Sequence, residues 1–182
     1  MLKHGFKRVL ALVILAVVIF SFVSCTKDAY APVGMKRITN KDIVDYTMYV
    51  PVEWTEDIST GIVTAYYSTK DRSNISMMAF DLDGENITMT PDEYWADYKE
   101  DFTNTFSDIA FEGEGEATLV DKIAAKKYVY TATVTGIQYK FMQVVTITNG
   151  TVYIFTYTST PANYDTHLEE VNDILSYIEF NH

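Results

Sequence analysis

Residues 128–158 constrain the fold of this 182-residue chain more than any other stretch. Over 128–135, Tyr, Thr, Ala and Val alternate with the two-residue period of a β-strand, giving one apolar face and one Thr-rich face. Apolar residues alternate again over 137–147, which predicts a second strand. Asn149-Gly150 is a strong hairpin signal, and the residues after it (TVYIFTYT) are typical of a returning strand. This part of the chain is therefore predicted to form an antiparallel meander.

Two helices are predicted beside this meander. Thr90-Pro91-Asp92-Glu93 is a helix start, because Thr can cap, Pro suits the first turn, and acids favour the positive end of the helix dipole. The aromatic residues that follow recur at helical spacing, which indicates a buried face, with a ligand-stacking platform as the alternative. The same spacing predicts a second helix over 161–176. Three further strands are predicted over 46–50, 61–69 and 74–80. The fold class expected is α+β, an antiparallel sheet with helices packed against it.

The first 25 residues carry a separate signal. A basic start is followed by an uncharged apolar run over 9–22 (VLALVILAVVIFSF), as in a secretory signal peptide. The run is shorter than the roughly 20 apolar residues that span a membrane, although a signal anchor or an ordinary secreted protein remain alternatives. Its end at Val23-Ser24-Cys25, the only cysteine, resembles a bacterial lipoprotein signal. That resemblance implies cleavage before Cys25 and lipidation (palmitate) of its side chain.

The expected organisation follows from this segment. We predict a lipoprotein signal peptide over 1–24, a lipid-anchored tether over 25–36 and a single domain over 37–182. The expected location is the extracytoplasmic face of a bacterial membrane, where two or more acyl chains hold a protein stably. The expected partners are the membrane, through the lipid anchor, and another protein that remains unidentified.

Charge excludes one class of function. The first 24 residues hold three of the 14 Lys and Arg residues and none of the 25 Asp and Glu residues, so the rest of the chain carries about 14 negative charges. Such a surface opposes nucleic-acid binding, which depends on neutralising phosphates. No Gly-rich phosphate loop is present, and no cofactor is expected.

The order of the elements resembles a known superfamily. Tyr49-Val50-Pro51-Val52-Glu53-Trp54 is similar to the strand-Pro-x-x-Trp pattern of PsbP-like and DcrB-like domains. The helix at Pro91, the long Tyr/Thr hairpin and the closing residues 175–180 follow in the same order. The resemblance implies an α/β/α sandwich around an antiparallel sheet. It also implies an accessory or binding protein rather than an enzyme.

Candidate chemistry is sparse. His167 is the one internal histidine available as a base, and its place on the predicted second helix suggests an exposed residue. No nucleophile motif accompanies it, so no catalytic residue is assigned. A hydrolase using carboxylates or His167 is nevertheless the alternative function from a different class.

Acidic residues form two groups. Asp81, Asp83 and Glu85 alternate in a predicted loop and are weak candidates for a Ca²⁺ site, although they lack calcium-loop spacing. Residues Glu112, Glu114 and Glu116 alternate with Gly113 and Gly115 in what we expect to be a second exposed loop. A Ca²⁺-dependent binding module is therefore a third possibility.

Overall fold

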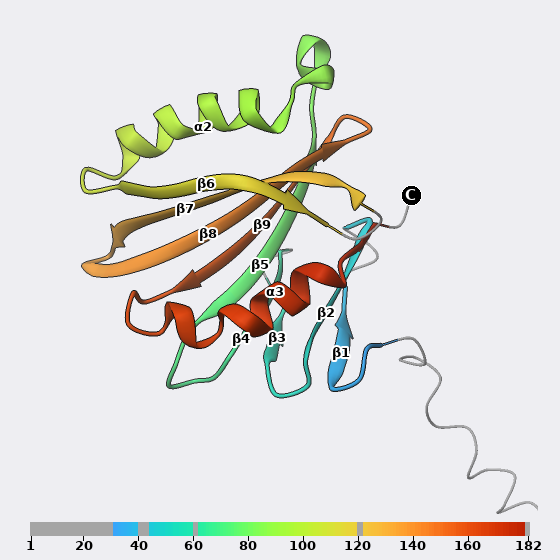
Figure 1. The fold of residues 1–182 in the computed structure, drawn as a ribbon, viewed down its shortest axis with the longest axis vertical. Helices are drawn as coiled ribbons and strands as arrows, with labels where there is room; N and C mark the ends of the chain where they lie inside the picture. The colour runs from blue at the N-terminus through green and yellow to red at the C-terminus, as the bar shows by residue number, and fades with distance from the viewer. Residues whose placement is uncertain (1–30, 40–43, 60–61, 120–121, 181–182) are drawn as a thin grey trace, which may run out of the picture. The chain divides into compact units, whose positions relative to one another are not determined.

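The computed structural model describes residues 31–39, 44–59, 62–119 and 122–180, and the chain from Pro32 onward is one compact unit. Within these residues the chain forms two antiparallel sheets and two α-helices (Figure 1). The predicted α+β class is therefore confirmed. The second, smaller sheet was not predicted from the sequence.

The large sheet has seven strands in the order β3-β4-β5-β9-β8-β7-β6. Every neighbouring pair in it is antiparallel. The predicted meander forms its centre and one flank, and residues 149 and 150 make the turn with the positive φ angles of 52° and 80° that a tight hairpin requires. The strands are β3 (Thr55–Asp57), β4 (Val63–Tyr66), β5 (Asn74–Asp81), β6 (Ala110–Thr118), β7 (Ala124–Val134), β8 (Ile137–Thr148) and β9 (Thr151–Ser159).

The small sheet has the order β1-β2-β10. Its strands are β1 (Met35–Ile38), β2 (Tyr46–Pro51) and β10 (Glu179–Phe180). The central strand β2 is buried from Tyr46 to Val50 because it has a strand on each side and the core beneath it. β1 begins at Met35, so the last two residues of the expected tether belong to this sheet.

Among the described residues, two α-helices and two 3₁₀-helices accompany the sheets. α2 (Pro91–Thr105) begins as predicted, with the Thr90 hydroxyl accepting from the Glu93 N–H and the Glu93 carboxylate accepting from the Thr90 N–H. α3 begins later than predicted: a turn and a 3₁₀-helix come first, and they place Tyr164 against Tyr157 in the core. The remaining helical bounds are α3 (Leu168–Ser176), η1 (Gly84–Thr88) and η3 (Tyr164–Thr166).

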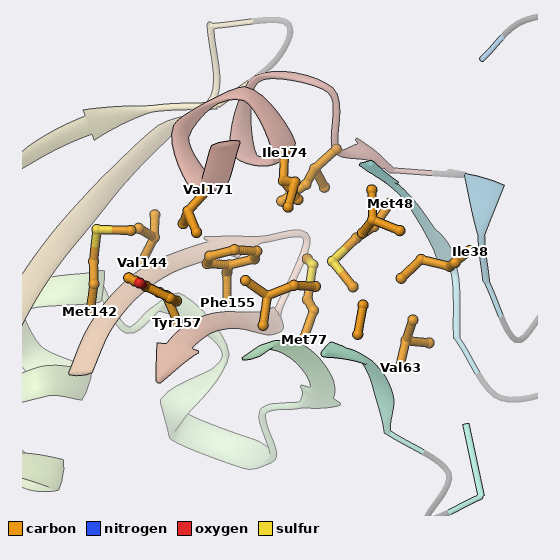
Figure 2. Packing of buried hydrophobic residues seen from close by; sticks show 14 of the residues in the cluster. Ile38, Met48, Val63, Met77, Met142, Val144, Phe155, Tyr157, Val171 and Ile174 are labelled. Atoms are coloured by element: carbon orange, nitrogen blue, oxygen red, sulfur yellow. The ribbon is translucent and has the colours of Figure 1, made fainter. Parts of the chain in front are cut away.

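Both faces of the large sheet are covered, as β9 shows. Val152 and Ile154 point into an aromatic cluster beneath α2. Tyr153, Phe155 and Tyr157, which point to the other face, belong to the larger core, which also takes in β2 and α3. Figure 2 shows Phe155 and Val171 directed into this shared space. The two helices therefore pack on opposite faces of the sheet, and this arrangement makes the sandwich.

The aromatic residues of α2 pack the helix against its face of the large sheet. Tyr94 and Trp95 are buried, and the Trp95 ring stacks on Tyr128 of β7 with the ring centroids 3.8 Å apart. Tyr98 and Phe102 lie half-buried at the margin of the same cluster. These aromatic residues thus form the packed face of the helix, as their spacing predicted.

Candidate functional site

His167 lies in the interior, whereas the sequence suggested an exposed helix residue. It is 3% exposed and stands immediately before the first residue of α3. The prediction was wrong because the helix begins at Leu168 rather than Pro161. The chain therefore enters the helix at His167, and the imidazole turns toward the loop between β4 and β5.

A carboxylate from that loop holds the imidazole. The His167 Nε2 atom lies 2.8 Å from Asp71 Oδ2, although 96 residues separate the two in the chain. Burial on its own would raise the pKa of Asp71, but hydrogen bonds from Ser73 and His167, with a further one from Asn163, outweigh burial and lower that pKa to about 2. Asp71 is therefore ionised near neutral pH and accepts a hydrogen bond from Nε2–H.

The other side of the imidazole faces a second carboxylate and two aromatic rings. Glu170 Oε2 lies 3.7 Å from His167 Nδ1, which is too long for a hydrogen bond. The same oxygen accepts from the indole Nε1–H of Trp54 at 3.2 Å. The Tyr67 ring lies over the imidazole with centroids 4.0 Å apart. We call Trp54, Tyr67, Asp71, His167 and Glu170 the histidine cluster.

The hydrogen bonds of Ser73, Asp71 and His167 differ from those of a serine-nucleophile site. Ser73 donates its hydroxyl proton to Asp71 Oδ1 at 2.6 Å and lies 2.7 Å from the Ser159 hydroxyl. A serine nucleophile would need its hydroxyl on the imidazole, with the carboxylate behind the ring. Here the serine and the histidine share the carboxylate, so His167 is not positioned to take the serine proton.

The histidine cluster instead joins three segments that are distant in the chain. Trp54 follows β2, Asp71 lies between β4 and β5, and His167 opens α3. Neither Asp71 nor Glu170 stands out in the sequence, because no local motif contains either one. The sole signal near Asp71 is a turn-forming stretch, Ser68 to Ser73, in which its main chain pairs with Ser68.

The second acidic group lies on a strand rather than in the expected loop. Residues Glu112, Glu114 and Glu116 belong to β6, which pairs with β7 at one end of the large sheet. Glycine lowers strand propensity, so the local sequence favours a loop; the hydrogen bonds offered by β7 override that preference. A register shift between Phe111 and Gly113 marks a bulge in β6.

Two lysines neutralise part of this strand. Lys126 Nζ lies 2.5 Å from Glu116 and 3.0 Å from Asp92 of α2, and these carboxylates raise the pKa of the lysine above its usual range. Lys140 pairs with Glu112 at 2.8 Å. Glu114 stands between these two ion pairs, opposite Tyr128, and makes no ion pair within the described part of the chain.

The weak Ca²⁺ candidates Asp81, Asp83 and Glu85 follow one another from the end of β5 into η1. Asp81 ends β5, and its Oδ1 atom accepts from the Thr151 hydroxyl at 2.7 Å. Asp83 is exposed in the following turn, and Glu85 lies in η1 with a side chain outside the described atoms. Among the residues that the structure describes, no group of three His, Cys, Asp or Glu side chains could hold a metal ion.

The predicted lipidation site, Cys25, and the apolar run before it lie outside the described residues. Across 31–39, 44–59, 62–119 and 122–180, no helix has the length and apolar character needed to span a bilayer.

Comparisons with known proteins identify the fold. No family model matches the sequence, and no curated protein matches it. The cyanobacterial PsbP (CyanoP) of Synechocystis superposes with a TM-score of 0.61 at 14% identity, over 88% of this chain and 99% of that one. PA94 of Pseudomonas aeruginosa, a protein of unknown function, gives a TM-score of 0.54 at 19% identity, over 79% and 94% of the two chains.

A third similar structure is LpqN of Mycobacterium tuberculosis, described as involved in cell envelope biogenesis. It has a TM-score of 0.50 at 15% identity, over 84% of this chain and 92% of that one. At these identities the likeness concerns the fold alone. The fold is PsbP-like/DcrB-like, and the resemblance drawn from the sequence is confirmed at that level.

Proposed function

We propose that this chain is a lipid-anchored accessory protein that binds a partner protein at the extracytoplasmic face of a bacterial membrane. The segment up to Cys25 supports the anchor, since it has the basic start, apolar run and terminal cysteine of a lipoprotein signal. The fold supports an envelope setting, because LpqN shares it and is described as involved in cell envelope biogenesis.

The observation that carries the binding role is the long strand β6 at the end of the large sheet. An uncovered strand edge offers a row of backbone donors and acceptors to another polypeptide. In the histidine cluster, by contrast, Trp54, Asp71 and His167 make their hydrogen bonds to other residues of the domain. Binding at a surface therefore fits the described residues better than chemistry at His167.

The anchor is tested by Cys25→Ala, with Thr26→Ala as the matched control. In cells fed radiolabelled palmitate, the wild-type chain and Thr26→Ala should take up label and enter the detergent phase. Cys25→Ala should do neither, because no thiol remains to be acylated. Label on Cys25→Ala, or an unlabelled wild-type chain, would refute a lipid anchor at this residue.

The binding role is tested by photo-crosslinking in intact cells. A photoreactive residue on the exposed surface should give a discrete protein adduct on the wild-type chain, identified by mass spectrometry. A chain that crosslinks to lipid alone from every exposed position would contradict the proposed role.

A further inference from the structure

The edge of β6 is the longest one left open in the described part of the chain. β6 has nine residues, whereas β3 at the other end of the large sheet has three. The outer strands of the small sheet, β1 and β10, have four and two. Along the described residues, the backbone groups of β6 hydrogen-bond to β7 and to no other strand, loop or side chain. Its outer side therefore presents unsatisfied donors and acceptors.

Gly113 and Gly115 leave one face of this edge bare. Neither has a positive φ angle, and a Cβ atom built on either meets nothing within 4 Å, so no internal contact requires a glycine. A glycine inside a strand often marks a bulge or the close approach of another backbone, and the bulge here involves only Gly113. On this face Gly113 lies opposite Val129 and Gly115 lies opposite the exposed Lys127. Val129 and Ala117 are half-buried against the larger core.

The opposite face of the edge is acidic. On this face Glu116 is paired with Lys126, whereas Glu114 is exposed and makes no ion pair within the described residues, so its charge is available to a new neighbour. The acidic side chains of β6 also disfavour pairing of this strand with β6 of a second copy of the chain. Antiparallel pairing of two β6 strands about their centre would put Glu114 opposite Glu114, and like charges directly opposite each other destabilise a sheet.

We propose that β6 binds an extended segment of a partner polypeptide as an eighth strand of the large sheet. The segment carries Lys or Arg facing Glu114 and a large apolar or aromatic side chain on the other face, above Gly115. The cation completes a cross-strand ion pair. The large side chain covers the bare glycine and contacts the strip formed by Val129 and Ala117. This inference rests on the proposed binding function and specifies the partner's chemistry.

A short peptide serves as the probe. The capped peptide Thr-Lys-Tyr-Lys-Tyr-Lys-Thr, which alternates cationic and aromatic side chains, is titrated into the full-length chain in detergent micelles at low salt. We expect saturable binding by fluorescence anisotropy. Hydrogen exchange should slow in residues 110–118, since their outward N–H groups become hydrogen-bonded, and should stay unchanged in β3. Binding without protection of 110–118 would refute strand addition.

Charge reversal tests the acidic face. Glu114→Lys should weaken the lysine peptide about threefold to tenfold and strengthen a peptide with Glu in place of Lys, because one cross-strand pair changes from attraction to repulsion. Glu56→Lys, on the exposed edge strand β3, is the matched control and should change neither affinity. Equal effects of the two substitutions would show nonspecific attraction and overturn the assignment.

The bare face is tested by the preference for aromatic side chains. The wild-type chain should bind the Lys/Tyr peptide more tightly than a Lys/Ala peptide, and Gly115→Thr should remove that preference, because its own side chain fills the strip. An unchanged preference, or concentration-dependent dimers of the wild-type chain, would overturn the proposal. If crosslinking in cells gives a partner while 110–118 stays unprotected, the binding function stands and strand addition fails.

Discussion

Replacing Asp71 with Asn should make the stability of the domain less dependent on acid pH. The hydrogen bonds from Ser73 and His167 hold the pKa of Asp71 at about 2 in the folded chain, below the ordinary value of 3.8. A carboxyl with a depressed folded pKa stabilises the fold above its unfolded pKa, and this stabilisation is lost as pH falls through the folded pKa. The window of loss therefore runs from about pH 4 to pH 2.

The size of the effect follows from the shift. A difference of about 1.8 pKa units corresponds to at most about 2.4 kcal/mol of unfolding free energy at pH 7. The Asp71 side chain is 23% exposed, so solvent screening lowers the expected value to about 1–2 kcal/mol. By linkage, about a third of the contribution remains at pH 2.5. Asn resembles the protonated acid in shape, so Asp71→Asn reports this difference directly.

Urea unfolding followed by tryptophan fluorescence measures the contribution of the Asp71 carboxylate to the unfolding free energy. The gap in unfolding free energy between the wild-type chain and Asp71→Asn should be about 1–2 kcal/mol at pH 7 and should shrink to about a third of that at pH 2.5. Asp97→Asn, at an exposed position of α2, controls for the loss of a surface charge and should show little gap at either pH. An equal gap for Asp71→Asn at both pH values would refute the role given to its hydrogen bonds.

Two further substitutions test the contact of Trp54 with Glu170 and the turn of the long hairpin at Gly150. Trp54→Phe should lower the unfolding free energy by about 2 kcal/mol, because it removes the hydrogen bond to Glu170 and some buried volume; no change on denaturation would exclude a structural role for that contact. Gly150→Ala should cost about 1–2 kcal/mol, since φ is +80° and the new Cβ would lie 2.7 Å from Ile87 Cγ1. Gly115→Ala, where a Cβ meets open space, is the control; similar losses at both glycines would contradict this account.

Local pattern predicted the elements whose causes are local. The hairpin at Asn149-Gly150 formed because those residues tolerate the positive φ angles of its turn. The first helix began at Pro91 because Thr90 and Glu93 satisfy the end of that helix themselves. Alternation along 128–135 likewise predicted a strand, which the structure contains within β7, since the two-residue period is a property of the backbone.

The sequence pattern did not predict that both faces of the large sheet are buried. We expected the 128–135 strand to have one apolar and one Thr-rich face, yet Thr131 on the Thr-rich face is buried. That face is covered because α3 and the small sheet pack on it, while α2 covers the other. Alternation shows where side chains point, but not what lies opposite them.

The candidate sites depended on contacts between distant residues. The sequence identified His167 as the single internal histidine but placed it at the surface, because its burial depends on Asp71, 96 residues away. It also placed Glu114 in a loop, because a strand containing two glycines forms only when a neighbour such as β7 supplies its hydrogen bonds.

The sequence by itself determined the period of each strand, the turn of the long hairpin, the start of the first helix and the PsbP-like order of elements. These follow from backbone preferences that act over a few residues. The tertiary structure decided which imidazole is buried and which strand is left at the edge of the sheet. Both outcomes depend on segments far apart in the chain coming into contact, and no local pattern encodes that contact.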